Sequence, residues 1–319
     1  MINLLDEIIP GSSSILPAPG SHGISLTADS VPCRSAPSDT AEQWQQLRYG
    51  ETYKLTGFSD QIDSLEKPVW YKIMIEQKNR FNSNEKIGDF EVWIESHRHT
   101  GISQKLYQEL NKPRSTEVFY RTITTQTYIK ALNDLRADQP IRLGTGARVL
   151  LYDNNDSTKI IGETGIWEIY EQEQKIDLPL FAPLARSAKN LEKTIRLHLG
   201  KSYVWGADGA GFDCSGFTRA IFKAFDIALP RNSNQQFQLG EIIIDLNSVK
   251  SGDLIFHKKT GAEKTSHVGI ILLLDGVPYI AHAKQRVRVE PLDINGLPAS
   301  IKATPDKELA GIKRIVQFE

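Results

Sequence analysis

The hydrophobic pattern of this 319-residue chain changes its period near residues 177–187. Before this segment short β-type stretches alternate with turn signals, whereas after it two helical stripes are followed by successive strands. Pro179 and Pro183 prevent a continuous helix across the change. The pattern predicts an α+β chain in which small β modules precede a domain of helices packed on an antiparallel sheet.

The part before this change is divided further by its turn residues. Residues 1–30 are rich in Ser, Pro and Gly, so we expect an irregular lead-in. Two small β-barrels are predicted, over residues 31–112 and 113–176, with a helical interruption around residues 102–110. Each block ends in a Trp-centred strand that follows a Gly, which is weak evidence of a diverged repeat.

Residues 177–319 form the predicted third domain. Apolar side chains at three- and four-residue spacing predict amphipathic helices over residues 185–199 and from Cys214 to Phe225. The segments that follow are typical of strands, in the order SGDLIFHKK, SHVGIILLLDG, PYIAHAK and RVRVEPL.

Charge and hydropathy exclude two classes of partner. The net charge is -1, from 38 basic and 39 acidic side chains, and no run of Lys and Arg could form a phosphate-binding stripe. We therefore expect no nucleic-acid partner. The longest apolar run, Val268 to Leu274, is much shorter than the ~20 residues that a membrane-spanning helix requires.

The first ten residues carry Asp6 and Glu7 where a secretory signal would carry Lys or Arg. Cys33 and Cys214 are the two cysteines, too few for a disulfide framework. We expect a cytoplasmic monomer, or a periplasmic or secreted protein if further residues precede Met1.

Cys214 is the strongest candidate for chemistry. It lies in GFDCSGF, where a Gly and Asp turn leads into the second helix, so the thiol falls in the first helical turn. The helix dipole there lowers a thiol pKa and favours the nucleophilic thiolate, with Asp213 as the N-cap. The alternative is that Cys214 is a small buried apolar residue, as most free cysteines are. Cys33, among Pro and Ser, is interpreted as structural.

Two histidines on predicted strands could serve such a thiol. His267 and His282 are 15 residues apart, and a hairpin at Asp275-Gly276 could bring both rings to one end of an antiparallel pair. His267 would accept the thiol proton and His282 would bond its far nitrogen. The alternative, for either ring, is a strand cap or a solvent contact.

The other histidines are interpreted as structural or exposed: His22, His97, His99, His198 and His257. A zinc site is not expected, because CxxC, HxxxH and HExxH spacings are all missing from the sequence. No metal and no cofactor are predicted.

Four motifs in order resemble one family. They are YVWGADGAGFDCSGF, SGDLIF, SHVGI and IAHA, and together they are similar to the NlpC/p60-type cysteine peptidases of bacterial cell walls. The resemblance covers roughly residues 180–319 and implies a circularly permuted papain-like fold. The two preceding β modules resemble the bacterial SH3-like domains of YkfC-like members, with weaker motifs.

The resemblance assigns roles to individual residues. It implies that Cys214 is the nucleophile, His267 the base and His282 the third polar residue of a catalytic triad. Asp213 and Ser215 would hold the free amino group of an N-terminal L-alanine, which suits a charge-assisted hydrogen bond.

Other positions would complete the substrate site. Tyr203 and Trp205 would line the same groove. Trp44 and Phe90 stand where YkfC-like relatives carry a Glu and a Tyr that also contact the substrate. Glu42 is the candidate to replace the missing carboxylate. The alternative is that the free-amine requirement is relaxed or that the pocket holds a different terminal group.

The implied reaction is hydrolysis of the γ-D-glutamyl to diamino-acid bond in peptidoglycan peptides such as L-Ala-γ-D-Glu-diaminopimelate. Two other hypotheses remain open. One is a peptidoglycan-binding module without turnover, and the other is an amidase or acyl transferase of the same superfamily.

Overall fold

The computed structural model describes residues 4–9, 16–27, 30–76, 89–112, 120–124, 127–132, 140–153, 156–162, 165–172, 180–209, 211–304 and 306–319. These residues form two compact units, one ending at Ala182 and the other beginning at Pro183. Pro179 and the residues that follow the predicted boundaries at 112 and 176 lie outside the described residues.

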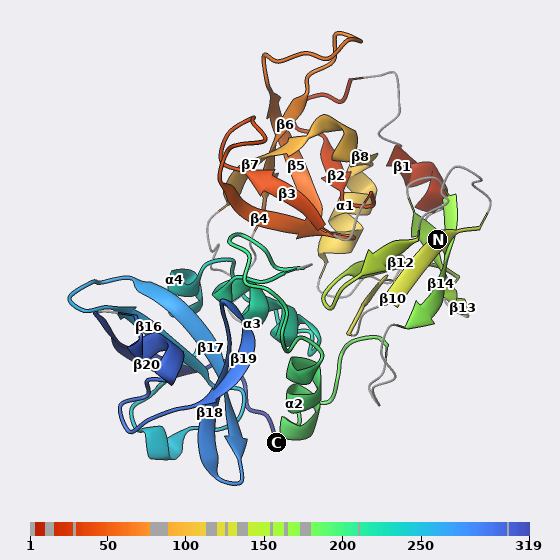
Figure 1. Cartoon of the computed structure of the whole chain (residues 1–319). Helices are drawn as coiled ribbons and strands as arrows, with labels where there is room; N and C mark the ends of the chain where they lie inside the picture. The colour runs from red at the N-terminus through yellow and green to blue at the C-terminus, as the bar shows by residue number, and fades with distance from the viewer. Residues whose placement is uncertain are drawn as a thin grey trace. The chain divides into compact units, whose positions relative to one another are not determined.

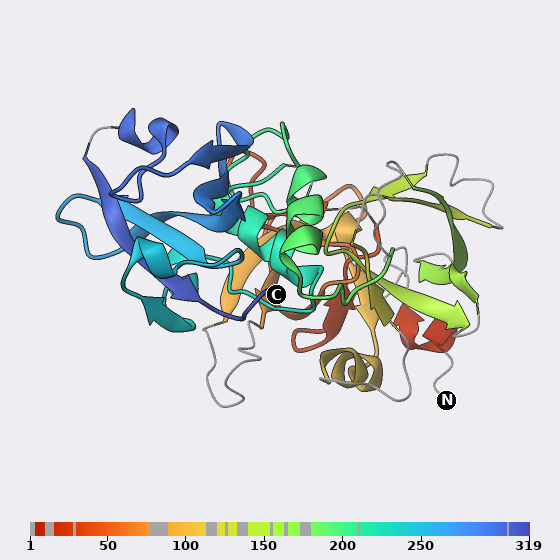
Figure 2. The same ribbon diagram turned by 90° about the horizontal axis from the view of Figure 1, so that it is seen from below.

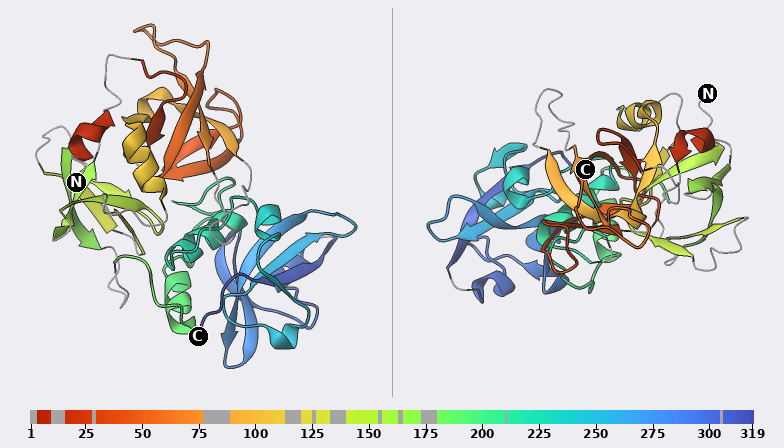
Figure 3. Two further views of the ribbon diagram at one scale, coloured as in Figure 1. Left: turned by 180° about the vertical axis from the view of Figure 1, so that it is seen from behind. Right: turned by 90° about the horizontal axis from the view of Figure 1, so that it is seen from above.

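The first unit contains two antiparallel sheets, seen as the orange and the yellow-green strands in Figure 3. The first sheet has the order β1-β8-β2-β5-β6-β7-β3-β4 and the second has the order β11-β10-β14-β13-β12-β9. The elements of the first sheet are β1 (Ile8–Ile9), β2 (His22–Ile24), β3 (Ser30–Arg34), β4 (Gln43–Arg48), β5 (Thr52–Phe58), β6 (Trp70–Ile75), β7 (Phe90–Glu95) and β8 (Thr100–Ile102), followed by α1 (Gln104–Asn111). Those of the second sheet are β9 (Tyr120–Thr122), β10 (Thr127–Ala131), β11 (Ile141–Leu143), β12 (Arg148–Asp153), β13 (Asp156–Gly162) and β14 (Gly165–Gln172).

The two sheets share buried side chains. One apolar cluster contains Ile24 and Leu106 from the first sheet and its helix, together with Ile129 and Trp167 from the second sheet. At the turn between β4 and β5, Gly50 has a φ of +77°, and a Cβ there would lie 1.9 Å from the carbonyl oxygen of Arg148. Only glycine fits this close approach between the sheets.

The predicted irregular lead-in is corrected by the structure. Within residues 1–30, β1 pairs with β8, and β2 lies between β8 and β5. These strands escaped prediction because two and three residues are too few to show a period of two. The predicted helical interruption is confirmed as α1, which begins after the N-cap Ser103.

The second unit contains one antiparallel sheet with the order β15-β20-β16-β17-β18-β19. Figure 1 shows α2 and α3 on one side of this sheet, which confirms the predicted architecture of helices on an antiparallel sheet. Its elements are α2 (Ala188–Arg196), α3 (Cys214–Lys223), α4 (Ser233–Gln236), β15 (Glu241–Ile243), β16 (Leu254–Lys259), β17 (Thr265–Leu274), β18 (Val277–Lys284), β19 (Arg286–Pro291), α5 (Ala299–Lys302) and β20 (Lys307–Arg314).

The core of this unit lies between α3 and the sheet. Phe217 and Ile221, one turn apart on α3, are fully buried with Val268, Ile270 and Ala281 of the central strands. Burial of such side chains contributes about 1.5–3 kcal/mol each, so α3 is held firmly against β17 and β18.

The end of the chain is also part of this unit. Glu319 bonds through its backbone to Arg186 and Ala188, and Figure 2 shows the C-terminus beside α2. In the described part of the chain no helix combines the length and apolar character needed to cross a bilayer.

Candidate active site

Helix α3 places the candidate nucleophile at its first residue. Asp213 is the N-cap, with its carboxylate accepting from the backbone N–H of Gly216 at 2.7 Å, as predicted. Gly216 lies so close to the preceding loop that a Cβ would be 2.2 Å from the carbonyl oxygen of Ala207. The start of α3, and with it Cys214, is therefore fixed by the cap and by close packing.

Asp213 is the centre of a buried polar network. Arg231 donates from Nη1 to Oδ1 at 3.1 Å and pairs with Oδ2 through Nη2. The N–H of Gly206 donates to Oδ2 at 3.1 Å, and Ser215 Oγ bonds to Oδ1 at 3.2 Å. Arg231 also donates to Ser215 Oγ at 3.0 Å. Both carboxylate oxygens are thus engaged, and Arg231 was not among the predicted site residues.

The predicted contact between the two histidines is confirmed. His267 on β17 and His282 on β18 meet with Nε2 and Nδ1 at 2.8 Å. Behind them Nε2 of His282 lies 3.0 Å from Glu290 Oε2, which also accepts from Ser300. Glu290 and Ser300 were not predicted. His257, interpreted as structural, is fully buried, and its ring centroid lies 6.0 Å from that of His267.

Contacts of α3 with β17 and β18 place Cys214 near this histidine pair. Helix α3 packs on β17 and β18, and the backbone amide of Val268, the residue after His267, is close enough to the thiol to lower its pKa. The thiol therefore lies at the end of β17 that carries His267.

The expectation of a ready thiolate is corrected. Burial raises the pKa of Cys214 to about 12 and the neighbouring Asp213 carboxylate adds to this, while the Val268 amide, Arg231 and the Ser215 amide act in the opposite direction. The helix start favours an anion, but the loss of solvent outweighs it. Burial, followed by His282 and His257, lowers the pKa of His267 well below its ordinary value. Both groups are neutral at rest, so sulfur needs a base when it attacks.

Comparison with known proteins agrees with this geometry. Residues 200–301, which include Cys214, His267 and His282, match the NlpC/P60 family. This segment therefore belongs to the NlpC/P60 family of cysteine peptidases. Relatives of the chain are named as dipeptidyl-peptidases and endopeptidases.

Two curated relatives are from Bacillus and are both named γ-D-glutamyl-L-lysine dipeptidyl-peptidase. The Bacillus cereus protein is 25% identical over 242 residues, covering 72% of this chain and 67% of the relative. The Bacillus subtilis protein is 32% identical over 130 residues, covering 40% of this chain and 41% of that protein. The second match thus spans less than half of the relative.

Two solved structures share the fold over most of the chain. An NlpC/P60 family protein from Bacillus cereus has a TM-score of 0.65 at 20% identity and covers 93% of this chain and 100% of its own. An NlpC/P60 endopeptidase from Photobacterium damselae subsp. piscicida has a TM-score of 0.61 at 16% identity and covers 92% and 70%. The fold therefore extends beyond the NlpC/P60 domain to the N-terminal sheets.

The predicted substrate-binding residues lie in different environments. Tyr203 packs on the NlpC/P60 core, and burial, followed by Cys214 and Asp213, raises its pKa, so it lies near the thiol. Trp205 is 62% exposed. Phe90 lies in the first unit, edge-to-face with Trp44 at 5.8 Å, and its role in substrate binding stays a prediction.

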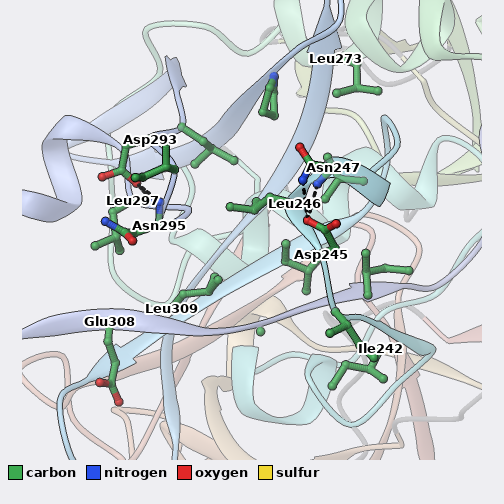
Figure 4. A pocket seen from close by; sticks show the side chains of 18 of the residues that line it. Ile242, Asp245, Leu246, Asn247, Leu273, Asp293, Asn295, Leu297, Glu308 and Leu309 are labelled. Atoms are coloured by element: carbon green, nitrogen blue, oxygen red, sulfur yellow. Dashed lines mark hydrogen bonds between the residues drawn. The ribbon is translucent and has the colours of Figure 1, made fainter.

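A separate apolar pocket lies in the NlpC/P60 domain (Figure 4). It is lined by side chains such as Ile242, Leu246, Leu273 and Leu309, and by none of the predicted catalytic or substrate-binding residues. This pocket is therefore distinct from the Cys214 site.

Proposed function

We propose that this chain hydrolyses the γ-D-glutamyl to diamino-acid bond of peptidoglycan stem peptides. One observation carries the proposal: a buried thiol at the start of α3 lies beside the strand whose His267 is bonded to His282 at 2.8 Å. The names of the two Bacillus relatives support this bond as the substrate.

The geometry supports nucleophilic catalysis by Cys214. As sulfur attacks the γ-carbonyl carbon, His267 accepts the thiol proton, and amides at the start of α3 stabilise the oxyanion. The imidazolium of His267 then protonates the leaving amine, and the C–N bond breaks to leave a thioester. His267 then deprotonates a water molecule, and the resulting hydroxide attacks the thioester. The C–S bond breaks, and the imidazolium of His267 returns the proton to sulfur.

This mechanism predicts a broad pH profile for kcat/KM. Protonation of His267 removes the base, and because its folded pKa is depressed, activity should persist below pH 6.5, the ordinary value. Cys214, with its pKa raised to about 12, should add no rise in activity near the ordinary thiol value of 9.0. Initial rates measured across the pH range check both the acidic and the alkaline side of the profile. A rise in activity with a midpoint near that thiol value would contradict the mechanism.

Selection of a free N-terminus is the finer part of the proposal. We propose that Ser215 and Asp213 hold the terminal amine, with Asp213 keeping its bonds to Arg231, and that Tyr203 and Trp205 flank the peptide. Glu42 lies in the first unit, where its Oε2 accepts from Trp44 Nε1 at 3.2 Å, and its role in substrate binding stays a prediction.

Cleavage of L-Ala-γ-D-Glu-diaminopimelate should exceed that of its N-acetylated form by about 10- to 100-fold, because one charge-assisted hydrogen bond contributes about 1.5–3 kcal/mol. Release of the diamino acid, followed by mass spectrometry, measures both rates. The acetylated peptide is the matched control, since it differs only at the amine. Equal rates would reject the terminal-amine hypothesis and leave the hydrolase intact.

The fold type of the N-terminal sheets and of the catalytic domain is part of the same proposal. The N-terminal sheets are proposed to be SH3-like barrels and the catalytic domain a permuted papain-like fold. Short antiparallel strands with bulges, such as those between Leu55 and Gly57 on β5, support this because bulges bend strands toward closure.

A further inference from the structure

The acceptor behind His282 has no role in the mechanism above. Glu290 Oε2 lies 3.0 Å from His282 Nε2, and Ser300 donates to the same oxygen. Glu290 comes from β19, where it pairs with Ile280, while His282 pairs with Arg288. Residues two apart on a strand share a face, so the carboxylate lies diagonally across from the His282 ring.

An ionised carboxylate decides which proton each ring carries. A carboxylate only accepts hydrogen bonds, so His282 carries its proton on Nε2 and presents a lone pair at Nδ1. That lone pair, 2.8 Å from His267 Nε2, requires the His267 proton on Nε2. A neutral imidazole has one N–H, so Nδ1 of His267 is left as the free base.

We propose that Glu290, held by Ser300, is a positioning residue that fixes the tautomers of His282 and His267 and stabilises the imidazolium formed when Cys214 gives up its proton. The inference rests on the proposed cysteine mechanism and extends it from three residues to four. Glu290 does not touch the substrate in this mechanism, because His282 and His267 lie between it and the thiol.

The surroundings of Glu290 keep it charged. Burial acts to raise its pKa, but hydrogen bonds from Ser300 and His282 and the charges of His282 and Arg288 outweigh burial and lower it. Arg288 Nη1 lies 3.7 Å from Glu290 Oε1. The charged and titratable groups near His267 include His257 on β16, Lys284 on β18 and Lys307 on β20, all of which disfavour a proton on His267.

Glu290→Gln, Glu290→Ala and Glu290→Asp test this role. In the first two, kcat for the tripeptide should fall about 10- to 100-fold, as when an orienting partner behind a working histidine is lost, with KM within about twofold. Glu290→Asp keeps the charge and should recover part of kcat. Glu241→Gln, an exposed carboxylate on β15, is the matched control and should leave kcat unchanged.

Two readouts do not depend on the peptide. The rate of Cys214 alkylation by iodoacetamide should fall in Glu290→Gln, and ¹⁵N shifts of the imidazoles should show less of the Nε2–H tautomer of His267. If the native protein fails to cleave the tripeptide while both readouts change, the proposed substrate is wrong and the role of Glu290 stands.

The inference is overturned if folded Glu290→Gln keeps its kcat and alkylation rate within about twofold of native, or if only KM changes. It is also overturned if kcat falls while the imidazole tautomers stay the same. Should Glu290→Ala not fold, the nearly isosteric Gln and Asp variants decide the matter.

Discussion

Cys214→Ala should reduce tripeptide hydrolysis by about 10⁴- to 10⁶-fold, because removal of a nucleophile eliminates the covalent route. The fold should persist, since the change deletes one sulfur atom from a core position that is 8% exposed. Release of the diamino acid measures the activity, and circular dichroism with thermal melting measures the fold.

Cys33→Ala is the matched control for this substitution. Cys33 is also buried, at 0% exposed, but lies in the core of the first sheet, so its removal should leave kcat close to native. Retained hydrolysis by Cys214→Ala would reject the cysteine mechanism. Binding of purified sacculi by native and Cys214→Ala proteins, with no hydrolysis by either, would instead support the binding-module hypothesis.

The parts of this site that depend on local sequence could be predicted. GFDCSGF encodes a cap followed by a helical stripe, and the structure confirms Asp213 as N-cap and Cys214 as the first residue of α3. His267 and His282 lie on adjacent strands of one hairpin, so their contact follows from a short connection. Predictions succeeded where a single helix or hairpin determines the geometry.

The missed residues owe their positions to packing between segments. Arg231 is 18 positions from Asp213 and follows a loop with no period, and Glu290 reaches His282 only through the register of β18 with β19. A lone Arg or Glu in a sequence usually indicates a solvated surface, so neither carried a signal. The prediction of a low thiol pKa was also wrong. It rested on the helix dipole, which depends on one helical turn, whereas burial of the thiol depends on the packing of the whole core.

The tautomers of His267 and His282 depend on both the predicted and the unpredicted residues. Hairpin geometry brings His267 to His282, but a contact between two neutral rings leaves two proton arrangements open. An anionic Glu290 selects one of them, so a residue outside the predicted triad determines whether His267 can act as a base. Local motifs therefore identify the reacting groups, and tertiary contacts determine their protonation.

Arg231→Met should lower the free energy of unfolding by about 3–5 kcal/mol, because it leaves the Asp213 carboxylate buried without its partner. The side chains of Arg231 and Asp213 are 2% and 8% exposed, so water cannot replace the lost hydrogen bonds. The variant also removes a donor to Ser215 and should loosen the start of α3. Urea unfolding monitored by Trp fluorescence measures the change.

Arg196→Met is the matched control, because it removes an Arg that pairs with Glu192 on the exposed face of α2, where such pairs contribute less than about 1 kcal/mol. Combining Asp213→Asn with Arg231→Met should cost less than Arg231→Met alone, since asparagine can still cap the helix and carries no charge. A loss for Arg231→Met no larger than that for Arg196→Met, or no recovery in the double variant, would show that the ion pair does not hold the nucleophile helix. The comparison separates the cost of burying an unpaired charge from the loss of one guanidinium, because only the first is relieved by neutralising Asp213.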